Sequence, residues 1–208
     1  MTPLAFMRAQ YPIQSLGFGS RIGVWFQGCS IHCLGCIVPE SWTATSQHMV
    51  SVEDLVARLE PWLQTCDGIT ISGGEPFDQP VALAALLQAL RARTTGDLLV
   101  YSGYVEQYLL TAHAALVGLP DVVVAGPFRA SLPDARAFVG SRNQTLLINT
   151  NLGRERYENL DVFERRLDFA VADGEILFAG VPRRGELERI VAGLLADGVE
   201  ASATHVPI

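Results

Sequence analysis

The sequence contains no lysine, and all 15 of its basic residues are arginine. Schiff-base chemistry and catalysis by a lysine base are therefore excluded. Basic charge is scarce as well, because 22 acidic residues give the chain a formal net charge of −7. Surfaces that bind nucleic acid normally carry an excess of basic side chains. We therefore expect no nucleic-acid partner.

Long apolar runs and a targeting signal are also missing from the sequence. No stretch approaches 18 uninterrupted apolar residues, so we expect neither a transmembrane helix nor a membrane partner. The first twelve residues lack a basic region followed by an apolar core, which a secretory signal would need. Four cysteines in 208 residues do not favour a secreted disulfide scaffold. We expect a cytoplasmic protein.

Apolar segments typical of strands alternate with segments of helical periodicity. This alternation, with helices of about 12 to 15 residues, predicts parallel βαβ units in an α/β fold. Polar and glycine-rich residues follow the expected strands, at the edge where α/β proteins place ligands. The expected strands span 21–28, 67–76, 97–104 and 121–126, and the expected helices span 51–64, 79–93 and 105–116.

The composition shifts toward charged residues from about residue 151. Residues 167–182 predict a β-hairpin around Asp173-Gly174, a favoured two-residue turn. Residues 184–197 predict a last helix. We expect one domain, in which 1–150 form the core and 151–208 form an extension packed on it.

Three of the four cysteines lie within eight positions, in "QGCSIHCLGCIVPESW" (27–42), with the spacing C-x3-C-x2-C. A disulfide among Cys29, Cys33 and Cys36 would leave one thiol unpaired. A structural zinc site usually has four ligands, and the fourth here would be His32 or Cys66. A second pair of closely spaced ligands is missing, so zinc is not favoured, but it stays open.

An iron–sulfur cluster is the third alternative for these thiols. Four-iron clusters usually have four thiolate ligands, so a non-catalytic electron carrier would need Cys66 as its fourth. Three protein thiolates would instead leave one iron open to a small chelating ligand. An open position of this kind indicates chemistry rather than electron transfer alone.

The cysteine motif after the first expected strand and "SGGEP" (72–76) after the second resemble the radical S-adenosylmethionine (SAM) enzymes. Within them, the chain is most similar to the glycyl-radical activases of anaerobic ribonucleotide reductases. The resemblance covers roughly residues 11 to 149. Its further matches are Gly35 before the third cysteine, "ESW" (40–42), "YSGY" (101–104), "GPF" (126–128) and "GSRNQ" (140–144).

The resemblance implies a partial (β/α)6-type open barrel, extended by the C-terminal hairpin and helix. It implies that Cys29, Cys33 and Cys36 hold a [4Fe–4S] cluster and that SAM chelates the fourth iron. An electron from a flavodoxin- or ferredoxin-type donor would then cleave SAM to methionine and a 5′-deoxyadenosyl radical. This radical would take a hydrogen atom from a glycine of a reductase partner. No catalytic side chain is implied beyond the cluster and SAM.

The same resemblance implies a set of residues around SAM. Gly73 and Gly74 would approach its methionyl ammonium, and Glu75 would supply negative charge nearby. Gly35 and Ile37, which flank Cys36, would lie near the adenine. Further polar contacts are expected from Ser102, Ser141 and Asn143. Either Arg21 or Arg142 would pair with a carboxylate.

The chain departs from the resembled branch at two places. The family often has an acidic residue at the end of the fourth strand, where this chain has Ala125. Residues 151–208 exceed what the short activases carry, and would extend the barrel, cover the cluster or recognise a different substrate. A radical SAM enzyme that modifies a peptide or small metabolite is therefore the alternative to an activase.

Overall fold

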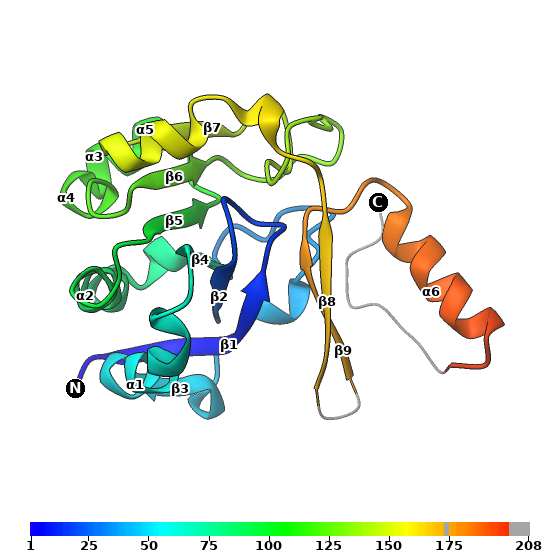
Figure 1. The fold of residues 1–208 in the computed structure, drawn as a ribbon, viewed down its shortest axis with the longest axis horizontal. Helices are drawn as coiled ribbons and strands as arrows, with labels where there is room; N and C mark the ends of the chain where they lie inside the picture. The colour runs from blue at the N-terminus through cyan, green and yellow to red at the C-terminus, as the bar shows by residue number, and fades with distance from the viewer. Residues whose placement is uncertain (173–174, 200–208) are drawn as a thin grey trace.

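The computed structural model describes residues 1–172 and 175–199. Its main sheet has the strand order β3-β1-β2-β4-β5-β6-β7 (Figure 1). The neighbours β2, β4, β5 and β6 pair in parallel, whereas β1 and β7 run antiparallel to the strands beside them. The predicted α/β fold with a mostly parallel sheet is therefore confirmed. The strands are β1 (Pro3–Ile13), β2 (Arg21–Phe26), β3 (Met49–Ser51), β4 (Gly68–Gly73), β5 (Asp97–Ser102), β6 (Val122–Ala125) and β7 (Thr145–Ile148).

Helices form three of the connections in this sheet and cover one of its faces (Figure 1). Helix α1 (Val52–Leu63) leads to β4, α2 (Pro80–Arg91) joins β4 to β5, and α3 (Glu106–Ala112) with α4 (Ala114–Val117) joins β5 to β6. No helix joins β6 to β7, where a loop returns the chain antiparallel. The described residues therefore contain fewer helical units than a (β/α)6 arrangement would have.

Two further helices lie outside these connections, namely α5 (Asn151–Tyr157) and α6 (Glu186–Ala196). Helix α6 confirms the predicted last helix. None of the helices within the described part of the chain is long and apolar enough to cross a membrane.

Strand β1 is the main element that the sequence analysis missed. It pairs antiparallel with both β2 and β3, and its pairing with β2 shifts register twice, between Phe6 and Arg8 and between Gln10 and Ile13. Such irregularities break the two-residue periodicity by which a strand is read from sequence. The polar side chains Arg8 and Gln10 interrupt the apolar pattern further.

The central strands bury side chains on both of their faces. In β5, Leu98 and Val100 pack against the helices, whereas Leu99 packs in a second cluster on the opposite face. The same alternation places Ile22 and Val24 of β2 toward the helices. Burial on both faces is typical of parallel strands and explains their continuous apolar sequences.

A separate two-stranded sheet lies across from the helices, on the other face of the main sheet (Figure 1). It consists of β8 (Leu167–Ala172) and β9 (Glu175–Gly180), which pair antiparallel and confirm the predicted hairpin. The expected turn residues, Asp173 and Gly174, lie outside the described residues. Asp168 anchors the hairpin by accepting hydrogen bonds from the amides of Gln14 and Ser15, at 2.7 and 2.8 Å.

Candidate functional site

The three clustered cysteines lie in the loop that follows the carboxyl end of β2. The chain enters this loop through Gly28, whose φ of 98° favours glycine, and the amide of Gly28 donates to the carbonyl of Ser41 at 2.7 Å. The amide of Cys29 donates to the carbonyl of Trp42 at 3.0 Å. Gly35 also has a positive φ, 81°. The glycine before the third cysteine therefore meets a backbone requirement of the loop, whatever its distance from a ligand.

A second set of hydrogen bonds ties this loop to the segments after β4 and β5. The carboxylate of Asp78 accepts from the amide of Ser30 at 2.8 Å and from its hydroxyl at 3.0 Å. The hydroxyl of Tyr104 donates to the same carboxylate at 2.7 Å. The three segments that follow adjacent parallel strands are thus joined around one side chain.

The thiols of Cys29, Cys33 and Cys36 are half-buried and form no disulfide. Burial raises the pKa of each thiol, and hydrogen bonds from nearby backbone groups offset part of that rise. Cys33 and Cys36 lie in one turn of the loop, in which the amide of Cys36 donates to the carbonyl of Cys33 at 3.1 Å. Soft thiolates in such a cluster fit iron–sulfur groups or zinc.

A single zinc ion fits this arrangement less well than a cluster does. Within residues 1–172 and 175–199, no three side chains of His, Cys, Asp or Glu are grouped so that they could hold one metal ion. A [4Fe–4S] cluster does not need such convergence, because each thiolate binds a different iron. The donor set therefore fits a cluster.

Neither candidate for a fourth ligand stands in the right place. Cys66 lies before the amino end of β4, and its sulfur contacts the carbonyl of Leu63 at 3.7 Å. Since β2 and β4 are parallel, a six-residue strand of about 20 Å separates it from the cysteine loop. The ring of His32 lies 4.7 Å from that of Trp42. The described chain thus supports three protein ligands rather than four.

The glycines of "SGGEP" make room for the backbone of the cysteine loop. A Cβ on Gly73 would lie 2.5 Å from backbone atoms of Phe26, and one on Gly74 would lie 2.0 Å from the carbonyl oxygen of Gly28. The amides of Gly74 and Glu75 donate to the carbonyls of Phe26 and Gly28, both at 2.8 Å. The close packing of β2 and the cysteine loop therefore requires both glycines, and their approach to a ligand stays a prediction.

Gly74→Ala is expected to lower the free energy of unfolding by about 1–3 kcal/mol, the usual cost of overpacking, because its Cβ would collide with backbone rather than with a movable side chain. It should also reduce the iron bound after anaerobic reconstitution. Chemical unfolding and iron analysis measure the two effects. Gly118→Ala is the matched control, since no atom lies within 4 Å of its added Cβ and Gly118 has helical φ and ψ. Equal stability and iron content in the two variants would contradict this account.

Glu75 is almost fully buried and connects the ends of β4 and β5. Its carboxylate accepts hydrogen bonds from the amide of Phe77 at 3.0 Å, the hydroxyl of Ser102 at 2.9 Å and the amide of Gly103 at 2.6 Å. Burial raises its pKa to about 7, against the opposing effect of these three donors. The side chain thus braces the site, and its expected charge near SAM stays a prediction.

The three polar residues predicted as SAM contacts have partners within the protein. The hydroxyl of Ser102 donates to Glu75 and accepts from the amide of Tyr104. Ser141 is fully buried, and its hydroxyl accepts from the amide of Arg129 at 3.1 Å. The amide nitrogen of Asn143 donates to the carbonyl of Pro127 at 2.8 Å, but its carbonyl oxygen is buried without a partner. Asn143 therefore keeps one acceptor that a ligand would satisfy.

A cavity of about 170 Å³ lies beside the cysteine loop. It includes three of the predicted site residues, namely Cys36, Ile37 and Gly73. Its wall also contains residues that the sequence analysis did not select, and several of them neighbour selected ones in the same motifs. These further lining residues are Ser72, Tyr101, Phe128, Gly140 and Gln144, with Leu16, Trp25 and Val38.

The C-terminal hairpin completes the wall of this cavity with residues 178–182. The carbonyl of Phe178 accepts a hydrogen bond from the guanidinium of Arg8 at 3.0 Å, and that guanidinium also lies over the ring of Trp25 at 4.7 Å. A hairpin far along the chain therefore meets the cysteine loop at one site. No sequence motif signalled this contact, because it depends on how the extension packs.

Arg21 and Ala125 both lie away from the cavity. Arg21 is fully buried and pairs with Asp97 at 2.8 Å, at the amino end of the parallel strands. The carboxylate partner of Arg21 in this structure is therefore a side chain of the protein itself. Ala125 belongs to the core cluster on the helix-covered face. For Arg142, the backbone amide donates to the carbonyl of Leu132 at 2.8 Å.

Comparisons with known proteins agree with this site. The family described as "4Fe-4S single cluster domain" matches residues 15–147, a range that contains the cysteine loop and the strands β2 to β6. An anaerobic ribonucleoside-triphosphate reductase-activating protein from Salmonella typhi is 33% identical over an alignment of 144 residues, which covers 65% of this chain and 94% of the relative. The match spans nearly the whole relative.

Two more distant likenesses extend the comparison. A pyruvate formate-lyase-activating enzyme from Clostridium pasteurianum is 29% identical over 102 residues, covering 45% of this chain and 43% of the relative. Among solved structures, QueE from Escherichia coli aligns with 49% of this chain and 52% of its own at 18% identity, with a TM-score of 0.40. At that TM-score we draw no conclusion from the structural alignment. The sequence relatives are activating proteins of anaerobic reductases and of a formate lyase.

Proposed function

The chain belongs to the 4Fe-4S single cluster domain family of radical SAM enzymes, and from this premise we propose that it is the activating enzyme of an anaerobic ribonucleotide reductase. The observation that carries the proposal is the site itself: the C-x3-C-x2-C loop and the "SGGEP" turn interlock at one edge of the sheet. The relative that this chain covers over 94% of its length is a reductase-activating protein.

Three thiolates and a neighbouring cavity suit the family's cofactors. A [4Fe–4S] cluster held by Cys29, Cys33 and Cys36 would supply the electron that cleaves SAM to methionine and a 5′-deoxyadenosyl radical, which takes a hydrogen atom from the substrate. Ile37 and Gly73, which line the cavity with Cys36, are proposed to contact SAM. The unpartnered carbonyl oxygen of Asn143 is proposed as a further acceptor for it.

The protein's own contribution is to hold these groups in place. The carboxylates of Asp78 and Glu75 tie the cysteine loop and the "SGGEP" turn to the segment after β5. Such bracing keeps the three thiolates at fixed spacing, as a site that directs a radical requires. We propose no catalytic side chain beyond these positioning contacts.

The extension is the specific observation that favours a second candidate function. About a third of the chain lies outside the match to the reductase-activating protein, since that match covers 65%. Residues 178–182 of the extension form part of the cavity wall. A wall of this kind would suit a radical SAM enzyme acting on a peptide or small metabolite, with the same cofactors and a different hydrogen donor.

Mixing the reconstituted protein with SAM, dithionite and the anaerobic reductase of the same organism is expected to generate a glycyl radical. Electron paramagnetic resonance (EPR) detects that radical, and chromatography detects 5′-deoxyadenosine. The matched control is the reductase with its radical-site glycine changed to alanine, which should give no glycyl signal. Formation of 5′-deoxyadenosine without a glycyl radical in the native reductase would contradict the activase proposal and support the second candidate.

A further inference from the structure

The indole N–H of Trp42 is a buried donor without a hydrogen bond in the described part of the chain. Burying a polar group without a partner is costly, so each such group calls for an explanation. Trp42 ends the "ESW" segment and is held beside the cysteine loop, because its carbonyl accepts from the amide of Cys29 at 3.0 Å. The group that would satisfy its N–H therefore belongs to this loop.

The sulfur of Cys36 is the acceptor that the surroundings of Trp42 offer. That sulfur already accepts a hydrogen bond from the amide of Val38 at 3.5 Å. The turn after Cys36 places Trp42 close to this residue in the chain, because the amides of Ser41 and Trp42 donate to the carbonyls of Val38 and Pro39 at 3.1 and 3.0 Å. Trp42 is therefore held one short 3-10 turn after Val38, the residue whose amide donates to this sulfur. The ring of His32, at 4.7 Å from that of Trp42, packs against the indole and restrains it.

We propose that the indole N–H of Trp42 donates a hydrogen bond to the Cys36 sulfur once that sulfur ligates the cluster, and that it thereby raises the cluster's reduction potential. A thiolate ligand is a stronger acceptor than a thiol, because it carries negative charge. Hydrogen bonds to cluster sulfurs stabilise the more negative, reduced state and so set the potential. Trp42 acts here as a positioning and tuning residue, not a catalytic one.

The inference rests on the family's cluster and not on the identity of the radical acceptor. Its test therefore needs no reductase. If the activase proposal failed while SAM cleavage remained, the role of Trp42 would be unaffected.

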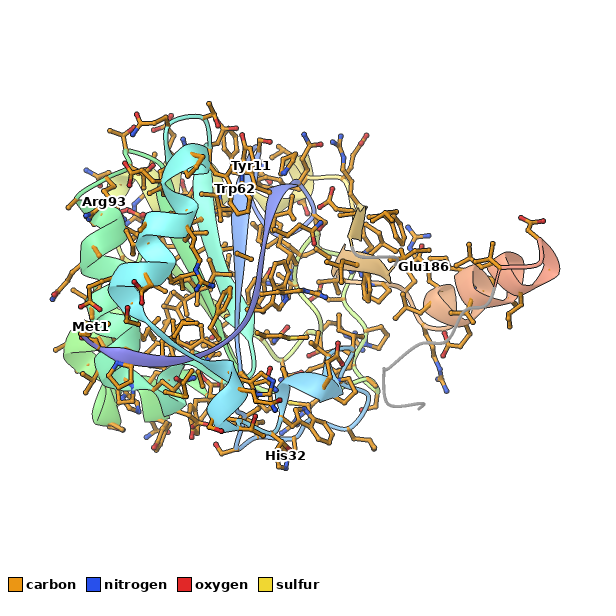
Figure 2. All side chains as sticks on the ribbon, turned by 90° about the horizontal axis from the view of Figure 1, so that it is seen from below. Met1, Tyr11, His32, Trp62, Arg93 and Glu186 are labelled. Atoms are coloured by element: carbon orange, nitrogen blue, oxygen red, sulfur yellow. The ribbon has the colours of Figure 1, made fainter. Side chains whose placement is uncertain are left out.

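Trp42→Phe is expected to shift the midpoint potential of the reconstituted cluster to a more negative value. Phenylalanine keeps an aromatic ring for His32 to pack against, although a smaller one, and removes the N–H donor. The potential is measured by anaerobic redox titration followed by EPR, together with the iron bound per chain. Trp62→Phe is the matched control, since Trp62 stacks on Tyr11 at the opposite end of the molecule from His32 (Figure 2). Equal potentials in the two variants, at equal iron content, would overturn the proposal.

A measurement on unsubstituted Trp42 keeps the proposal testable if Trp42→Phe binds no cluster. In protein labelled with 15N at the indole nitrogens, the reduced cluster should show a nitrogen coupling in electron–nuclear double resonance. Trp25 also lines the cavity, so the labelled Trp25→Phe variant assigns the signal. A coupling that persists in Trp25→Phe supports Trp42 as the donor. Absence of the coupling, or its loss in Trp25→Phe, overturns the proposal.

Discussion

Cys33→Ala is expected to abolish the formation of 5′-deoxyadenosine, whereas Cys66→Ala is expected to leave it intact. Cys33 is the middle member of the cysteine loop, and its carbonyl accepts a hydrogen bond from the amide of Cys36 at 3.1 Å. Without it, two thiolates would remain for a cluster that the three cysteines are proposed to hold with one iron open. Loss of activity should therefore follow loss of bound iron rather than a change in SAM binding alone.

The measurement combines iron and sulfide analysis, EPR of the reduced protein, and chromatography of the products after incubation with SAM and dithionite. Cys66→Ala is the matched control, because it removes a half-buried thiol from the opposite end of β4. Product from Cys33→Ala would rule out Cys33 as a required ligand. Loss of iron in Cys66→Ala would instead support the alternative of a non-catalytic electron carrier, in which Cys66 is the fourth ligand of the cluster.

The parts of the site that follow from local sequence could be predicted. The apolar pattern already indicated the two strands that precede the site motifs. One strand leads into the three spaced cysteines, Cys29, Cys33 and Cys36, and the other leads into the two glycines of "SGGEP". Because the carboxyl ends of parallel strands share one edge of a sheet, the motifs had to meet. The hairpin β8–β9 was equally predictable, since a favoured turn pair lies between two apolar runs.

The direction of individual side chains could not be predicted in the same way. Ser102 was selected from "YSGY", yet its neighbour Tyr101 lines the cavity and Ser102 bonds to Glu75. Successive residues of a strand point to opposite faces, so the motif alone does not indicate which of two neighbouring residues faces a cavity. Similarly, Gly140 and Gln144 of "GSRNQ" line the cavity rather than Ser141 or Asn143.

The long-range packing of the C-terminal extension could not be predicted from the sequence either. The contact of residues 178–182 with the cavity depends on anchors such as Asp168 with Ser15 and Arg8 with Phe178. These pairs are separated by 153 and 170 positions. The charge pattern of the extension alone does not indicate which loop it will meet.

The second substitution with a large expected effect on stability lies at the amino ends of the strands. Asp97→Asn is expected to lower the free energy of unfolding by about 3–5 kcal/mol, the usual cost of breaking a buried ion pair. Asp97 and Arg21 are both fully buried and pair at 2.8 Å. The aspartate also accepts from the hydroxyl of Tyr157 at 2.8 Å and pairs with Arg156. Its neutralisation would leave the Arg21 charge buried without its counter-charge.

Chemical unfolding at neutral pH measures this loss, and Glu164→Gln is the matched control. Glu164 pairs with Arg166 at 3.1 Å, but the two side chains are 80% and 53% exposed, so its replacement should change stability by less than about 1 kcal/mol. A loss for Asp97→Asn no larger than that of Glu164→Gln would contradict the role given to the buried pair.

The pH dependence of stability gives an independent check on Asp97. Burial alone would raise the pKa of this carboxyl, but Arg21, Arg156 and Tyr157 outweigh burial and hold the pKa below its usual range. A carboxyl with a depressed pKa contributes stability above its unfolded pKa, about 3.9, and this contribution is lost as pH falls through the folded value. The stability difference between native protein and Asp97→Asn should therefore be full at neutral pH and shrink on strong acidification. A difference that stayed constant through the acid range would show that the charge of Asp97 is not what stabilises the fold.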